Sequence, residues 1–249
     1  MSSQLTQRIR RTRVIVAMLY LGVPLLFLAL TLRISAQADT FAWWAVLVPL
    51  ALLALGWVWW RGGRLTPDRW SGTGMMVGGI AALATVLLVN QLDVPGVLYR
   101  VAAVGFGVVG WLGGRYGAHT LLQPPIAELA DTQYELSYRM RGLTRLRLVI
   151  GADSVSLREK VRVKAAHGED SWSTDSTTFP LAAVTGVHVV DLSGAERLRY
   201  PVSLTLPPAG TPGPALILQA QGQDWVLPQN QAAAVAEILQ RRIATARTR

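Results

Sequence analysis

The chain has 249 residues, a net charge of +9 and no cysteine. Hydrophobic residues make up 51% of it, and its mean hydropathy of +0.32 is high for a water-soluble protein. The lack of cysteine excludes disulfides, thiolate metal sites and a cysteine nucleophile. The three histidines are far apart and have no metal-ligand spacing.

The apolar excess is confined to the first part of the chain. Up to Gly114 there are nine arginines and three acidic residues, whereas from Arg115 onward there are 15 basic and 12 acidic residues. This change of composition predicts a membrane domain at residues 1–114, a linker at 115–131 and a water-soluble domain at 132–249.

The first apolar run, residues 14–32, follows a cluster of four arginines. It is 19 residues long, which exceeds the roughly 7–15 apolar residues of a signal peptide, so we expect an uncleaved signal anchor rather than a cleaved signal. Arginines ahead of the run predict a cytoplasmic N-terminus.

The second run, residues 41–60, is 20 residues without a charge, and as a helix it would span roughly 30 Å of bilayer. Tryptophans stand near both ends of it, as is typical of the two headgroup zones. Arg61 and Arg64 follow directly and predict that this end faces the cytoplasm. A buried helix of a soluble protein is the alternative, but it gives no reason for the aromatic ends or the flanking arginines.

Two more apolar runs, residues 72–90 and 96–114, complete four predicted transmembrane helices and return the chain to the cytoplasmic side. Both runs carry small residues, several of them four positions apart, which let helix backbones approach closely. We expect them to pack as a hairpin, against a membrane-protein partner or against a second copy of the chain. The candidate packing residues are Gly74, Gly78, Ala82, Ala103, Gly107, Gly110 and Gly114.

The C-terminal part changes from a helical to an alternating pattern. Residues 145–150 and 154–164 alternate apolar and polar side chains, so each predicts a half-buried strand. Similar segments predict seven or so antiparallel strands, and one amphipathic helix follows from Asn230, its expected N-cap, to about residue 246. We expect a small, partly open β-barrel with the helix capping one end.

Two segments resemble a known family. TFPLAAVTGVHVVD, residues 178–191, resembles the strand pattern apolar-Pro-Leu-x-x-Val/Ile-x-x-Val of bacterial pleckstrin-homology-like (PH-like) domains, and residues 224–243 are similar to that family's last strand and C-terminal helix. The resemblance covers about residues 132–248. It implies a binding or assembly module that is often joined to membrane helices, with no enzymatic activity and no cofactor. The turn at residues 151–153 is too short for the long basic loop that holds phosphoinositides in eukaryotic relatives.

Six basic residues form the candidate binding surface: Arg145, Arg147, Arg158, Lys160, Arg162 and Lys164. The spacing of two places four of them on one face of one strand, within about 20 Å. Beneath an anionic inner leaflet, each cation would contribute about 1 kcal/mol of attraction. An ordinary solvated strand face is the alternative. Trp172, in a polar loop expected at residues 170–175, is a candidate partner contact.

No chemical motif indicates catalysis, because the sequence has no GxSxG elbow, no metal-ligand spacing and no P-loop. Exposed aromatics do not interleave with the basic residues, so nucleic-acid binding is not expected. The excess of arginine over lysine, 22 to two, is typical of a GC-rich bacterial genome.

We therefore predict a non-enzymatic scaffold, assembly factor or accessory subunit in the bacterial inner (plasma) membrane. Its cytoplasmic domain would bind a protein partner or the anionic inner leaflet, with neither cofactor nor metal. The alternative is a component of a transporter or channel, which normally carries ionisable residues at mid-membrane. No acidic residue lies in the middle of any predicted span.

Overall fold

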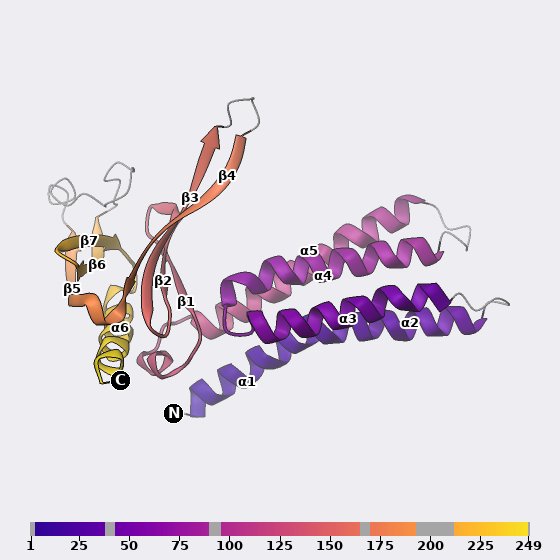
Figure 1. Cartoon of the computed structure of the whole chain (residues 1–249), viewed down its shortest axis with the longest axis horizontal. Helices are drawn as coiled ribbons and strands as arrows, with labels where there is room; N and C mark the ends of the chain where they lie inside the picture. The colour runs from indigo at the N-terminus through magenta and orange to yellow at the C-terminus, as the bar shows by residue number, and fades with distance from the viewer. Residues whose placement is uncertain (1–2, 38–42, 90–95, 165–169, 193–211, 249) are drawn as a thin grey trace. The chain divides into compact units, whose positions relative to one another are not determined.

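The computed structural model describes residues 3–37, 43–89, 96–164, 170–192 and 212–248 (Figure 1). The chain divides into two compact units, Met1–Leu122 and Gln123–Arg249. The first unit is helical and the second consists mainly of antiparallel strands.

The helical unit contains five α-helices and one π-helical turn in its described residues. They are α1 (Ser3–Ala17), η1 (Met18–Gly22), α2 (Val23–Gln37), α3 (Trp43–Gly63), α4 (Pro67–Val89) and α5 (Gly96–Leu122). The π-helical turn lies directly before Pro24. Proline lacks the main-chain N–H and its ring clashes with the carbonyl four residues earlier, here that of Tyr20, and a wider turn accommodates this clash.

Two helices differ in length from the expected runs. Helix α4 begins at Pro67, a residue suited to the first turn, where its missing N–H has no helical partner. Helix α5 continues eight residues past Gly114 and ends just before Pro124, which cannot extend it.

In the described part of the chain, Ser3–Arg33 and Val46–Gly63 are long and apolar enough to cross a membrane.

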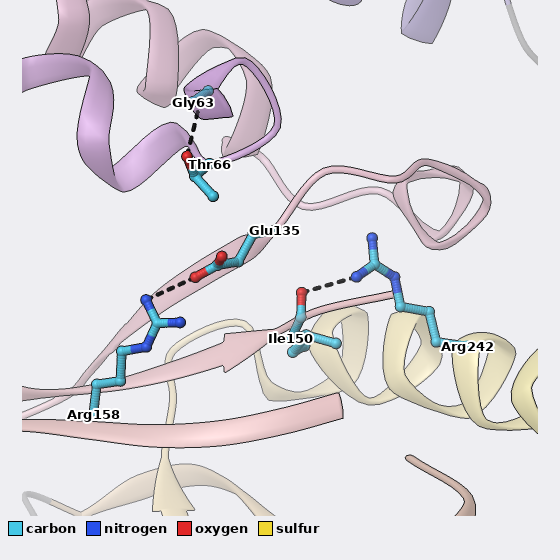
Figure 2. A network of polar contacts seen from close by, with 6 residues as sticks. All are labelled: Gly63, Thr66, Glu135, Ile150, Arg158 and Arg242. Atoms are coloured by element: carbon cyan, nitrogen blue, oxygen red, sulfur yellow. Dashed lines mark hydrogen bonds and ion pairs between the residues drawn. The ribbon is translucent and has the colours of Figure 1, made fainter. Parts of the chain in front are cut away.

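The turn between α3 and α4 is held by one carbonyl. Gly63 accepts hydrogen bonds from the Thr66 hydroxyl at 3.0 Å (Figure 2) and from the Trp70 indole N–H at 2.9 Å. These donors satisfy a carbonyl that the end of α3 would otherwise leave without a helical partner.

The helical unit has a small interior and an apolar exterior. Phe27, Leu52 and Ala81 form a buried cluster joining α2, α3 and α4, and the Phe27 ring meets the Phe106 ring edge-on at 5.5 Å between centroids. Most of the exposed large hydrophobic side chains of the described residues lie on the outside of this unit. Examples are Leu25, Leu26, Leu47, Leu50, Val58, Met75, Met76, Val104, Val109 and Leu112.

The second unit contains seven strands, two short 3₁₀ helices and one α-helix in its described residues. They are η2 (Ala127–Asp131), β1 (Leu136–Met140), β2 (Leu143–Ile150), β3 (Ser154–Lys164), β4 (Asp170–Pro180), η3 (Leu181–Ala183), β5 (Val184–Leu192), β6 (Gly213–Ala220), β7 (Gln223–Pro228) and α6 (Ala232–Arg247). The strands form two antiparallel sheets, in the orders β1-β2-β3-β4 and β5-β6-β7. The antiparallel strand arrangement and the C-terminal helix are therefore confirmed, β1 is an additional strand, and the sheets are open rather than a closed barrel.

The core of this unit lies between the sheets and α6. Alternate residues of β1 to β3, such as Leu136, Leu148 and Leu157, are fully buried. Helix α6 packs on β5, β6 and both 3₁₀ helices. A main-chain hydrogen bond also joins two segments far apart in the sequence: the Arg141 N–H donates to the Pro228 carbonyl at 2.8 Å.

Two expectations for this unit are wrong, and a third falls outside the described residues. Residues 170–175 are strand rather than loop, since β4 pairs with β3 out to Lys164 and Asp170. Asn230 is not the N-cap of α6: Gln231 holds that position, and the Asn230 side-chain oxygen accepts a long hydrogen bond from Arg141, 3.5 Å. A strand expected at residues 199–206 lies outside the described residues.

Candidate functional site

Three arginines line up across three neighbouring strands. In the strand register Arg139 on β1 lies opposite Arg147 on β2, and Arg147 lies opposite Arg158 on β3. Directly opposed residues of antiparallel strands project on the same face, and neighbouring strands are about 4.8 Å apart. The three guanidinium groups therefore belong to one row on one face of the sheet. Ser176 continues that row on β4.

Further cations extend this row along the strands. Arg145 and Lys160 each lie two residues from a member of the row, so they share its face, and both are exposed. Arg162 and Lys164 occupy the next two positions of the same face of β3, but their side chains lie outside the described residues. We call Arg139, Arg145, Arg147, Arg158 and Lys160 the cationic face.

A carboxylate borders the cationic face. Glu135, just before β1, forms an ion pair with Arg158 at 2.8 Å (Figure 2). The two side chains are 20% and 40% exposed, so solvent screens the pair and its contribution to stability is at most about 1 kcal/mol. Like charges directly opposite one another destabilise a sheet by about 0.2–1 kcal/mol per pair. The ion pair on Arg158 offsets part of that repulsion.

The strands β3 and β4 extend beyond the rest of their sheet. Strand β2 pairs with β3 only as far as Glu159, whereas β3 and β4 remain paired from Lys160 and Thr174 to Lys164 and Asp170. Figure 1 shows this part as a two-stranded ribbon projecting from the sheet. The register places Trp172 opposite Arg162 within it.

Arg139 is the member of the cationic face that the sequence analysis did not select. It lies in β1, whose residues Leu136, Tyr138 and Met140 are buried while Arg139 is exposed. The sequence LSYRM alternates apolar and polar residues in the same way, and this pattern predicts a strand. Its alignment with the other arginines follows only from the strand register.

Arg242 on α6 does not belong to the cationic face and is buried within the β unit. A basic residue near the C-terminal end of a helix ordinarily interacts with the helix dipole from an exposed position, but Arg242 is only 3% exposed. Its guanidinium donates hydrogen bonds to six main-chain carbonyls, one of which, Ile150, is drawn in Figure 2. The carbonyls belong to Leu129, Ala130, Thr132, Tyr134, Ile150 and Gly151, at 2.6–3.3 Å. Burial lowers the pKa of Arg242, and the nearby Tyr138 opposes this shift.

The small residues of α4 and α5 lie against each other within the chain. A Cβ added at Gly74 would overlap the Gly110 main chain, and one added at Gly110 would overlap that of Gly74. Cβ atoms at Gly78 and Gly114 would likewise overlap main-chain atoms of the facing helix, whereas one at Gly107 would make ordinary contact. Ala82 and Ala103 lie on the same two helices, and their side chains are outside the described residues.

The described residues hold no group of three or more His, Asp or Glu side chains that could bind a metal ion. The described residues of the cationic face are thus basic side chains bordered by the Glu135 carboxylate.

Comparison with known proteins finds a similarity to a bacterial membrane protein. The chain is 33% identical over 79 residues to the inner membrane-spanning protein YciB of Cupriavidus necator. The aligned stretch is 30% of this chain and 43% of that protein, so the chain covers less than half of the relative's length. No family model matches the chain, and the PH-like resemblance stays a prediction. Together with the two apolar helices, the similarity indicates a membrane-associated protein.

Proposed function

We propose that the chain is a non-enzymatic scaffold, assembly factor or accessory subunit in the bacterial inner membrane. Four helical passes, formed by α1–α2, α3, α4 and α5, would anchor it. Its β unit would then lie in the cytoplasm and bind a membrane-protein partner or the anionic leaflet.

The observation that carries this proposal is the distribution of exposed apolar side chains. Of the large hydrophobic side chains exposed in the described residues, Val189 is the one that belongs to the β unit; the others lie on α1 to α5 and η1. In water, so large an apolar surface would drive aggregation, whereas lipid chains cover it without cost. Exposed residues such as Met75 on α4 and Val109 on α5 belong to the same surface. It therefore includes the two helices that the sequence alone predicts to be transmembrane.

Helix length supports the same conclusion. Helix α4 has 23 residues and α5 has 27, which correspond to about 35 and 40 Å. Both exceed the roughly 30 Å of a bilayer's hydrocarbon core.

Matching aromatic and basic pairs support the proposed orientation. Arg61 lies 5.0 Å from the centre of the Trp57 ring on α3, and Arg115 lies 5.2 Å from that of Trp111 on α5. Tryptophan favours the headgroup zone, and arginine beyond it favours the cytoplasmic side. The two helices would both run toward the cytoplasm, which agrees with this repeated arrangement.

The fold of the second unit supports the PH-like part of the proposal. Seven antiparallel strands in open sheets, followed by one helix packed on β5 and β6, agree with what the resemblance implies. A module of this kind acts by binding, which fits the cationic face better than catalysis does.

Extraction and purification test the proposal. The chain should remain in the membrane fraction after alkaline carbonate, and purification in mild detergent should recover the same membrane-protein partner at constant stoichiometry in repeated preparations. Release by carbonate would contradict the membrane anchor. Recovery of the chain alone in every preparation would contradict the scaffold or accessory role.

A further inference from the structure

The arrangement of the cationic face is not required by the fold of the sheet. The core residues Tyr138, Leu148 and Leu157 lie on the other face, although Val149, two positions from Arg147 on the face of the row, is buried as well. Arg139 is exposed and the Arg158 side chain is 40% exposed, so neither position is filled to pack the core. Three arginines in direct opposition repel one another, and a sheet selected for stability alone would avoid that repulsion. An anion that binds several of them together would reduce this repulsion further, beside the interactions that Arg147 and Arg158 make within the chain.

We propose that the cationic face docks on the anionic surface of the membrane that anchors the chain, and that the row Arg139, Arg147 and Arg158 binds lipid phosphates. This inference rests on the proposed membrane function and specifies its ligand. Arginine suits phosphate because its planar guanidinium donates two parallel hydrogen bonds.

An extended bilayer fits this face better than a single small ligand does. The cations occupy three strands and continue, by register, along the ribbon to Arg162 and Lys164. Such a broad array matches a plane of many phosphates. The register also places Trp172 opposite Arg162 on the ribbon.

The short connector between the two units lowers the entropy that the β unit loses on docking. Residues 123–126 separate the end of α5 from η2, and four extended residues reach about 14 Å. The attraction of a cation to an anionic leaflet acts within roughly 8–10 Å at physiological salt. A unit tethered by so short a connector meets the lipid surface at a high effective concentration.

Glu135 would compete with the lipid. Its carboxylate occupies Arg158 at 2.8 Å, and a lipid phosphate would take its place on docking. Arg158 then exchanges one anion for another, so loss of the carboxylate should favour the docked state. This gives a variant that strengthens docking beside one that weakens it.

The test uses the full chain in nanodiscs of phosphatidylcholine alone or with equimolar phosphatidylglycerol. Because the chain has no cysteine, a single Ser176→Cys carries a unique fluorophore next to the arginine row. Quenching by a lipid with a nitroxide on its headgroup reports proximity to the bilayer surface. Ser173→Cys, exposed on the opposite face of the same strand, is the matched position.

We expect the Ser176→Cys label to be quenched more strongly in the anionic nanodiscs, and high salt to abolish the difference. Arg158→Gln should weaken docking about fivefold, the equivalent of about 1 kcal/mol per cation, and Glu135→Gln should strengthen it. Arg241→Gln is the control, because it removes one cation from an exposed ion pair on α6. It should leave quenching unchanged.

Equal quenching in neutral and anionic nanodiscs would overturn the proposal, as would equal effects of Arg158→Gln and Arg241→Gln. A label shielded by added RNA or an acidic peptide, without dependence on lipid, would overturn it in favour of those ligands. A misfolded variant cannot imitate the expected gain from Glu135→Gln. Failure here leaves carbonate extraction and partner recovery unaffected, so it is distinguishable from failure of the proposed function.

Discussion

The guanidinium of Arg242 on α6 donates a 2.8 Å hydrogen bond to the main-chain carbonyl of Ile150 at the end of β2 (Figure 2). The same side chain binds carbonyls of η2 and of the segment leading into β1. One residue of the last helix thus holds the first segment of the β unit and the turn between β2 and β3. A buried main-chain carbonyl that loses its donor costs free energy, although that of Leu129 also accepts from Thr132 at 2.7 Å.

Arg242→Met should destabilise the β unit by about 3 kcal/mol or more, because the carbonyls would lose their donors while remaining buried. Hydrogen exchange of the full chain in detergent measures this, with faster exchange expected at residues 127–151. Arg241→Met, one position along the same helix and exposed, is the control. Equal exchange in the two variants would contradict the role assigned to Arg242.

The contact between Gly74 and Gly110 predicts the effect of enlarging either residue. Gly110→Ala should force α4 and α5 apart and destabilise the helical unit by about 1–3 kcal/mol, because the added methyl meets main-chain atoms. Gly105→Ala on the same helix meets open space and should be neutral or slightly stabilising. Thermal unfolding in detergent compares the two. A Gly110→Ala variant as stable as Gly105→Ala would disprove the close packing.

Tyr138 gives a prediction about alkaline pH. Its hydroxyl is buried with no hydrogen-bond partner among the described residues, and burial raises the pKa of Tyr138, with the charge of Arg242 opposing this shift. The folded state therefore holds the phenol proton more tightly than the unfolded state, whose tyrosine has a pKa near 10. The stabilisation is complete below that pH and is lost as the pH rises further.

Tyr138→Phe should accordingly remove this part of the alkaline sensitivity and leave stability at pH 7 unchanged or raise it by about 1 kcal/mol. Denaturant unfolding monitored between pH 8 and about 11 measures both effects. If the variant is clearly less stable at pH 7, the hydroxyl has a partner that this account omits.

The sequence predicted the helices and most of the antiparallel strands, β1 excepted, because their residues carry strong periodic signals. The outer part of β4 gave no such signal, although the segment of β3 that pairs with it did. No third strand pairs with this part of the ribbon among the described residues, so nothing requires an alternation of apolar and polar residues in β4 there. Residues 170–175 therefore read as a polar loop.

The roles of individual arginines were harder to predict. Arg242 follows Ile238 by four positions and Leu239 by three, which places it on the apolar stripe of α6. Charged side chains are seldom fully buried, so the stripe position alone does not predict the burial of Arg242. The row that contains Arg139 depends on which residues of different strands lie opposite each other, and composition does not determine register.

The location of the β unit relative to the membrane is the claim on which both proposals depend. Single cysteines at Ala36, exposed near the end of α2, and at Ser173 on β4 test it with a membrane-impermeant maleimide applied to intact spheroplasts. We predict that Ala36→Cys is labelled at once and that Ser173→Cys is labelled only after lysis. Labelling of Ser173→Cys in intact spheroplasts would contradict the account.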